Sequence, residues 1–197
     1  MIKDFIKQYI APLLKSYKFK KKNYVWNSSK DNFIQVVDFQ LSSISNEEKG
    51  QFTINIGIFD SNLWQKCWNS DVPKFIKEVD CFPRFRIGEV LDDFSGKSID
   101  YWWDYHPDID KEKLAKDIID ILENKCFPFL DSMMSYEAMN HFYTLNKINL
   151  MPIEKIYLAI IKHEINNFSD STTLLNEVSS ISESWNKRVE TVRTQLQ

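Results

Sequence analysis

The stretch that most restricts the fold of this chain is "FTINIGIF", residues 52–59, in which large apolar side chains alternate with polar or small ones. Strict alternation of this kind is typical of a β-strand that buries one face and keeps the other face polar. The stretch "NFIQVVDFQLS", residues 32–42, alternates in a similar way, with Gln35 as the exception on its apolar face. Because the two stretches are close in sequence, an antiparallel meander is the simplest way to pair them.

Further short segments extend this pattern into an α+β fold. "NYVWN" reads as a strand before the polar turn "SSKDN", and "RFRIGEVL" alternates as a fourth strand would. Apolar residues three and four apart predict helices over residues 2–14 and 110–126. Pro12 either kinks the first helix or lies where it frays, and Pro128 closes the second. We predict an α+β fold in which an antiparallel sheet of three to five strands packs on the N-terminal and central helices, with a C-terminal helical extension. Between sheet strands, "SNLWQKCWN" and "VPKFIKEV" each resemble a short helix.

After residue 135 the pattern is helical only. Pro152 opens a predicted helix over residues 152–166. The last predicted helix carries an apolar stripe with gaps of three and four residues: Leu174, Val178, Ile181, Trp185, Val189, Val192 and Leu196. Leaving this stripe in water would forgo about 1.5–3 kcal/mol per side chain. We therefore expect it to form an antiparallel hairpin with the 152–166 helix, so that residues 136–197 pack on an α+β domain of residues 1–135. A homodimer formed through the C-terminal helices is the alternative.

Composition and charge argue against several classes of protein. The net charge of −3 disfavours nucleic-acid binding. The one dense basic run, "KSYKFKKK" at residues 15–22, is interpreted as a solvated turn, or else as an anion or partner patch. No apolar run is long enough to span a membrane, and the N-terminus lacks the apolar core of a signal peptide. Three widely spaced cysteines fit neither a disulfide framework nor a zinc motif. We expect a cytoplasmic protein with no cofactor and no membrane or nucleic-acid partner.

The best candidate site lies on the polar face of the predicted sheet. It is formed by Asp38, Gln40, Thr53 and Asn55, with Arg84 and Arg86 as an extension. One interpretation is that these residues are only the solvated side of an antiparallel sheet. The other is a shallow polar site, in which arginine can bind a carboxylate or phosphate through two hydrogen bonds.

A second candidate is "IDYWWDYHPDID", residues 99–110, whose acidic residues and His106 could serve as metal ligands. Asp108 and Asp110 precede a helix expected to begin near Lys111, where aspartate caps free amide groups. Nothing directs the other carboxylates to one point, so we expect a helix cap and no metal site. If the segment is extended, Trp102 and Trp103 point to opposite sides, which predicts one core residue and one lid or recognition residue.

The order of several short motifs resembles a known family. "LLKSYKFKKKNYVWN", "FIQVVDFQLSS", "FTINIGIF", "FRIGEVL" with "YWWDY", and "LAKDIIDILENKCFPFLD" are similar to the bacterial domain-of-unknown-function family four-three-zero-four, over roughly residues 1–135. This chain departs from the pattern at Tyr17-Lys18, in place of the turn glycine, and at Asp38, in place of asparagine. The resemblance implies small bacterial cytoplasmic proteins, some encoded beside toxin and immunity genes, and supplies no catalytic residues.

These observations lead to two functional hypotheses. The favoured one is a non-catalytic binding protein of the immunity or adaptor kind, whose aromatic-rich and mildly acidic surface suits a basic protein partner. The alternative is a small-ligand or phosphate/carboxylate-binding protein, or an enzyme, that uses the polar sheet face. No serine elbow, HExxH motif or cysteine with a nearby base occurs, so no catalytic residue is assigned. The candidate binding residues are Asp38, Gln40, Asn55, Arg84, Arg86, Trp102 and Trp103.

Overall fold

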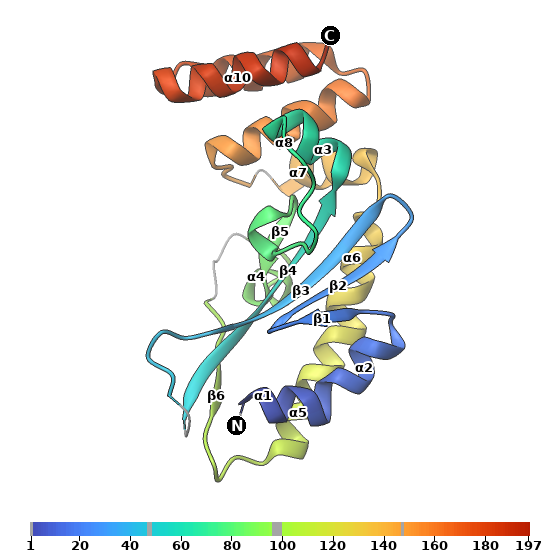
Figure 1. Cartoon of the computed structure of the whole chain (residues 1–197), viewed down its shortest axis with the longest axis vertical. Coiled ribbons are helices and arrows are strands. Elements are labelled where there is room, and N and C mark those ends of the chain that lie inside the picture. Colours follow the sequence, from blue (N-terminus) through green and yellow to red (C-terminus); the bar gives the residue numbers. More distant parts are fainter. Residues whose placement is uncertain (1, 47–48, 96–99, 147) are drawn as a thin grey trace.

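The structure, a computed structural model, describes residues 2–46, 49–95, 100–146 and 148–197 (Figure 1). Its strands are β1 (Lys20–Lys22), β2 (Val25–Lys30), β3 (Phe33–Leu41), β4 (Gly50–Asp60), β5 (Arg84–Arg86) and β6 (Trp103–Tyr105). Its α-helices are α1 (Ile2–Phe5), α2 (Ala11–Ser16), α3 (Ser61–Trp68), α4 (Ile87–Leu91), α5 (Lys111–Ile121), α6 (Phe127–Ser132), α7 (Tyr136–Asn146), α8 (Pro152–Glu164), α9 (Phe168–Ser179) and α10 (Glu183–Gln195). Two π-helical segments, η1 (Ile6–Ile10) and η3 (Leu122–Cys126), and one 3-10 turn, η2 (Glu78–Asp80), complete the described elements.

The strands form one antiparallel sheet in the order β1-β2-β3-β4-β5, and the short β6 pairs with the start of β4. The predicted α+β class and the meander are confirmed, and β5 confirms a strand at "RFR". Its continuation "IGEVL" is α4 and not strand. The strand β6 within "YWWDY" was not expected, and it brings the described sheet to six strands. The lysine run is also partly strand, because Lys20–Lys22 forms β1 at the sheet edge, with all three lysines exposed.

The inner face of the sheet carries the main hydrophobic core. The alternating side chains of β4 on this face, from Phe52 to Ile58, are fully buried. Figure 1 shows α2, α5 and α6 lying alongside the sheet, and their apolar residues belong to the same core cluster. Gln35, the polar exception on this face, donates from Nε2 to Oδ1 of Asp131 at 2.7 Å, so the buried amide is satisfied by the end of α6.

Both helices that contain an internal proline pass through it by means of a π segment. The amide of Ala11 donates to the carbonyl of Ile6 just before Pro12, and the amide of Phe127 donates to Leu122 just before Pro128. Proline lacks an amide hydrogen and its ring clashes with the carbonyl four residues earlier, and a wider turn moves that carbonyl away. The prediction that Pro128 closes the central helix is therefore wrong, since helical structure continues to Ser132.

The outer face of the sheet is crossed by residues 72–83. "SNLWQKCW" forms α3 as predicted, but "VPKFIKEV" is irregular apart from η2, so its predicted helix is wrong. Its apolar residues bury against the sheet instead: Ile76 and Cys81 pack with Val36 and Phe59 in a second, smaller cluster. A Cβ added at Gly57 would lie 2.6 Å from Cβ of Cys81, so glycine permits this close crossing.

The C-terminal stripe is divided between two helices. A single helix from Leu174 to Leu196 was predicted, but α9 ends at Ser179 and α10 begins at Glu183. Ser182 has extended backbone and its Oγ accepts from the amide of Trp185, which is the geometry of a helix N-cap. Ile181, which lies in the break, is 53% exposed. The partner of α8 is therefore α9, which follows after the short link 165–167, and α10 packs on α9 and α3.

Helix α3 follows β4 directly and packs on the C-terminal helices α8 and α10. Trp68 donates from Nε1 to the hydroxyl of Tyr157 at 2.7 Å, and the guanidinium of Arg188 lies 4.5 Å from the centre of the Trp68 ring. One hydrophobic cluster runs from Phe5 to Val192. The division at residue 135 and the homodimer stay predictions. Within the described ranges, no helix is long and apolar enough to cross a membrane.

Candidate functional site

The register of the sheet brings most of the predicted site residues together on the outer face. Asp38 lies opposite Asn55, and Asn55 lies opposite Arg86, so these three form a row across β3, β4 and β5. Asn55 donates from Nδ2 to Oε1 of Gln40 at 2.8 Å. Arg84 is two residues from Arg86 and shares its face, because alternate residues of a strand point to the same side. The strand alternation predicted this arrangement.

A hollow of about 450 Å³ opens beside this row and is called here the acidic hollow. It is lined by Gln40, Asn55, Glu78, Val79, Arg84, Phe85, Arg86, Glu89 and Glu154. Asp38 lines a smaller neighbouring hollow of about 200 Å³, the Asp38 hollow, together with Lys22, Lys77, Glu78 and others. Because Glu78 and Val79 line both, the two hollows lie on either side of η2.

Both arginines already have acidic partners. Nη1 of Arg84 lies 3.4 Å from Oε1 of Glu78, and Nη1 of Arg86 lies 2.5 Å from Oδ1 of Asp100. The guanidinium of Arg86 also lies 5.7 Å from the centre of the Trp102 ring. An incoming anion would therefore have to compete with protein carboxylates for each guanidinium.

Two of the carboxylates that line the acidic hollow also serve as helix caps. Glu89 accepts from the amide of Arg86 at 2.8 Å at the start of α4, and Glu154 accepts from the amide of Met151 at 2.8 Å at the start of α8. Burial raises the pKa of Glu89, although its hydrogen bond from the Arg86 backbone acts in the opposite direction. Burial likewise raises the pKa of Glu78, despite the nearby Arg84. The hollow thus holds more carboxylates than its two arginines neutralise.

Asp38 is the carboxylate with the least compensation. Within the described part of the chain its side chain has no hydrogen bond and no ion pair. Burial raises its pKa to about 6, and the negative charge of Glu78 acts in the same direction. Lys22 and Lys77 line the same hollow without reaching ion-pair distance of Asp38. A half-buried anion of this kind suits a cationic group supplied by a ligand.

Asp38→Asn should stabilise the protein at pH 7.5 by about 1 kcal/mol, a value reduced for the solvent that reaches this half-buried side chain. A carboxyl whose folded pKa is raised to about 6 binds its proton more tightly in the folded state, so ionisation destabilises the fold above that pH. The gain from the substitution should therefore disappear as the pH falls from about 6 towards the unfolded value near 4.

Urea denaturation at pH 7.5 and at pH 4.5 measures this difference, with Asp117→Asn on the exposed side of α5 as the matched control. An equal effect of Asp38→Asn at both pH values would contradict the assignment of the raised pKa.

The aromatic and acidic segment 100–110 is divided between the two faces. Trp103 is buried on the inner face and stacks on Phe52, whereas Trp102 is half-buried beside Arg86. The prediction that the two tryptophans point to opposite sides is confirmed. Asp110 caps α5 by accepting from the amide of Lys113 at 2.9 Å, as predicted.

Within the described ranges, no group of three histidine, cysteine or acidic residues could hold a metal ion. The three cysteines are free and buried. Burial raises the pKa of Cys67 and of Cys126 to about 12, and that of Cys81 well above its ordinary value. Thiolate, the nucleophilic form, is therefore disfavoured at all three positions.

Sequence reasoning missed five residues that line the acidic hollow: Glu78, Val79, Phe85, Glu89 and Glu154. Glu89 had a local signal, because it lies three residues after Arg86 at the start of a helix, where glutamate commonly caps. Glu154 had the same signal as a helix cap, but nothing in the sequence placed it beside a strand about seventy residues earlier. Thr53, by contrast, faces the outer side but is fully buried, and its hydroxyl has no partner among the described residues.

Comparison with protein families identified one match. Residues 10–132 match the family described as "Domain of unknown function (DUF4304)". This confirms the resemblance drawn from the motifs of residues 1–135. Neither the curated proteins nor the solved structures yielded a match.

Proposed function

This chain belongs to the DUF4304 family, whose function is unknown, and we propose a function for it from the outer face of its sheet alone. The proposed function is that of a non-catalytic binding protein, of the immunity or adaptor kind, which engages a basic protein partner. The three free cysteines support a cytoplasmic location, where thiols remain reduced. A protein that acts by covering its partner needs a complementary surface and no catalytic group.

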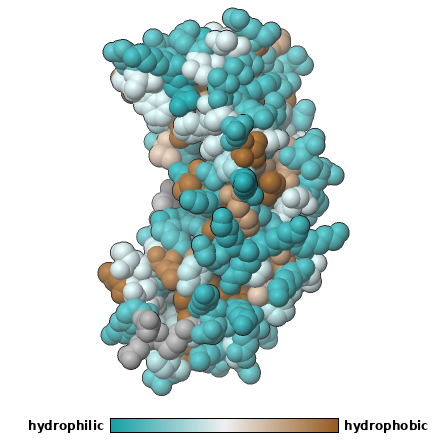
Figure 2. Space-filling view, viewed as in Figure 1, coloured by the Kyte–Doolittle hydropathy of each residue, from teal (hydrophilic) through white to brown (hydrophobic). Residues whose placement is uncertain are grey.

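The observation that carries this proposal is the position of Val79. Its side chain is 66% exposed on the η2 turn, between the acidic hollow and the Asp38 hollow. The turn itself is held by an amide-to-carboxylate bond from Lys77 to Asp80 at 2.9 Å. An apolar anchor on a fixed turn, surrounded by charged groups, matches the centre and rim of a protein interface. Figure 2 shows a largely hydrophilic face with small separate apolar patches, which suits an interface with few apolar anchors.

The charges around Val79 indicate the sign of the partner. Asp38 has no ion pair among the described residues and burial raises its pKa, and burial also raises the pKa of Glu78 even though Arg84 lies beside it. A lysine or arginine of a partner placed in either hollow would form an ion pair that the protein lacks on its own. Such complementarity sets specificity and the rate of association more than affinity.

The alternative, a small anion bound by Arg84 and Arg86, has less support. Each guanidinium is paired with a carboxylate, and Glu89 and Glu154 line the same hollow. Like charges at close distance oppose the entry of a carboxylate or phosphate there. A cationic or neutral polar group fits the same space without this penalty.

Replacing Val79 by aspartate should abolish partner binding, because it removes the apolar anchor and adds a negative charge beside Asp38 and Glu78. The measurement is affinity capture from the source cells with the immobilised full chain, with quantification of each retained protein. Ile44→Asp is the matched control, because Ile44 is also a β-branched residue, 80% exposed, on a separate loop. The partner should be retained by the wild type and by the control, and lost from Val79→Asp.

Retention of the same protein by Val79→Asp would refute the docking face. Binding should also weaken as the pH falls through about 6, because protonation of Asp38 removes the charge that attracts a basic partner. A complex that strengthens over this pH range would contradict the proposed sign of the partner.

A further inference from the structure

A third hollow lies on the same outer face, between the β1–β2 edge and residues 73–76. Its volume is about 400 Å³, within the range of small-molecule sites. It is lined by Lys18, Lys20, Asn27, Ser29, Ile34, Pro73, Lys74, Phe75 and Ile76. It is called here the lysine hollow, and it has no lining residue in common with the acidic hollow.

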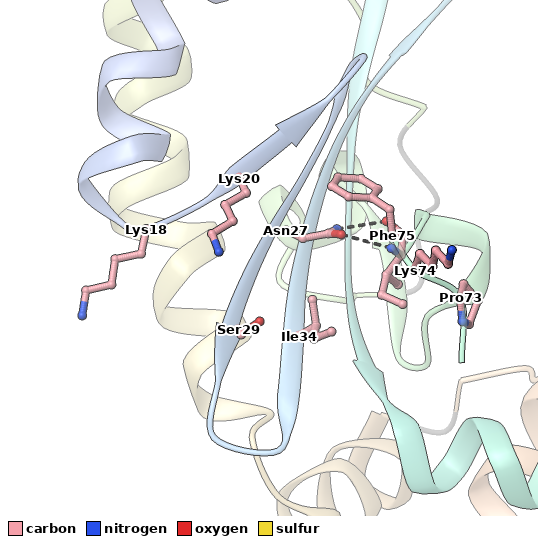
Figure 3. Close-up of a pocket in the computed structure, with 9 residues that line it drawn as sticks. Lys18, Lys20, Asn27, Ser29, Ile34, Pro73, Lys74 and Phe75 are labelled. Atoms are coloured by element: carbon pink, nitrogen blue, oxygen red, sulfur yellow. Dashed lines mark hydrogen bonds between the residues drawn. The ribbon is translucent and has the colours of Figure 1, made fainter. Parts of the chain in front are cut away.

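The charge of the lysine hollow is entirely positive. Three lysines line it and none of its lining residues is acidic. Within the ranges that the structure describes, Lys18, Lys20 and Lys74 form no ion pair. Figure 3 shows the three side chains spread around the hollow, with Lys18 and Lys74 at opposite sides. Because lysine is a long flexible side chain with three donors, each can turn toward an anion placed between them.

The floor of the hollow is apolar and held in place. Ile34, Pro73, Phe75 and Ile76 form it, and Ile76 is buried in the second hydrophobic cluster. The side chain of Asn27 clamps the crossing segment to β2, donating from Nδ2 to the carbonyl of Ile76 at 2.9 Å and accepting from its amide at 3.1 Å, as drawn in Figure 3. The hollow is therefore formed before any ligand binds, which lowers the entropic cost of binding.

From this combination we infer that the lysine hollow binds a small anion with a flat apolar body, namely a carboxylate or phosphate ester carried on an aromatic ring system. The apolar body would lie on Ile34 and Phe75, and the anionic group would accept hydrogen bonds from lysine ammonium groups. A bare inorganic anion would leave the apolar floor in water, and a neutral aromatic would leave the ammonium groups without a partner. This site adjoins the face proposed to engage the protein partner, because Phe75 lines both the lysine hollow and the Asp38 hollow.

The test uses the full-length protein labelled with nitrogen-15 and four probes: 2-naphthyl phosphate, 2-naphthoate, 2-naphthol and inorganic phosphate. Amide shifts in two-dimensional NMR spectra report both the affinity and the residues involved. We expect saturable binding of one or both naphthyl anions, with shifts concentrated in residues 18–34 and 74–76. The naphthyl anion that binds with the higher affinity shows whether the hollow prefers a phosphate ester or a carboxylate. The neutral naphthol and the inorganic phosphate should each bind at least about tenfold more weakly.

Variants decide whether the lysines and the floor are responsible. The double substitution Lys20→Gln with Lys74→Gln should weaken binding of the naphthyl anion by about tenfold or more, since hydrogen bonds to charged groups are lost. Phe75→Leu should weaken it with the charges intact, and the matched double substitution Lys113→Gln with Lys116→Gln on exposed positions of α5 should leave it unchanged.

Three results with the naphthyl probes would overturn the inference. They are an equal affinity for 2-naphthol, amide shifts centred outside the hollow, or no saturation by either anion at about 5 mM, a concentration that corresponds to negligible affinity. A DNA or RNA oligonucleotide that shifts the same amide signals and binds with higher affinity than both naphthyl anions would also overturn the inference, in favour of a nucleic-acid surface.

Discussion

Removing everything after residue 148 should leave a chain that no longer unfolds cooperatively and that aggregates in solution. The truncation deletes α8, in which Ile156, Ile160 and Ile161 are fully buried. It also exposes their partners, including Phe82 and the buried side of α3. Full burial of a large aliphatic side chain contributes about 1.5–3 kcal/mol. The loss of several such residues approaches the whole stability of a domain, which is about 5–15 kcal/mol.

Urea denaturation followed by tryptophan fluorescence, together with light scattering, measures the outcome. A shorter truncation after Ser180 is the graded control, because it removes only α10 and its contacts of Arg188 with Trp68 and with the carbonyl of Cys67. It should lose part of the stability but keep a cooperative transition. If residues 1–148 unfold at the same midpoint as the full chain and stay monomeric, the C-terminal helices are an independent appendage. If the full chain is dimeric and residues 1–148 are monomeric, the C-terminal helices around Trp185 form the subunit interface, as the homodimer prediction states.

The second large effect is expected at Phe82. Its ring is 2% exposed and stacks between two tyrosines, with centroid distances of 5.1 Å to Tyr143 and 5.2 Å to Tyr157. These tyrosines belong to α7 and α8, so one side chain of the crossing segment joins the sheet to both helices. Truncation of a buried phenylalanine to alanine removes its transfer free energy and leaves a cavity. Phe82→Ala should therefore lower the free energy of unfolding by about 3–5 kcal/mol.

Phe168→Ala provides the matched control for the same substitution. Phe168 is 51% exposed at the start of α9, so its removal should lower the free energy of unfolding by less than about 1 kcal/mol. The measurement is the urea midpoint of each variant at constant slope. A loss below about 1 kcal/mol for Phe82→Ala would mean that Phe82 does not link the sheet to α7 and α8.

The candidate site was predictable to the extent that it depends on strand alternation. The alternate polar residues of β3 and β4 indicated that Asp38, Gln40 and Asn55 share a face, and Arg86 joined them once β5 paired with β4. The ion pairs of this row could not be predicted from the strand alternation, because they depend on which segment of the chain approaches this face of the sheet. Asp100 reaches Arg86, and Glu78 reaches Arg84, from loops with no period of their own.

The helix boundaries show the same limit for local rules. Proline usually ends a helix, yet the chain passes Pro12 and Pro128, because a π segment just before each proline keeps the helix in register with its packing against the sheet. In the opposite direction, a stripe with helical gaps is interrupted by a serine cap at Ser182. Side-chain spacing therefore identified the buried faces of these helices more reliably than it identified their ends.

The sequence by itself determined the strands of the meander, the amphipathic helices and the division of Trp102 and Trp103, because these follow from periods of two and about 3.6 residues that are local to each segment. Only the tertiary structure decided that residues 72–83 cross the outer face over Gly57 and that Glu154 and Arg84 line the same hollow. It likewise decided that Lys18 and Lys74 line opposite sides of one hollow. Those positions depend on contacts between residues far apart in the chain, where packing and the burial of charge, and not local backbone preference, select the arrangement.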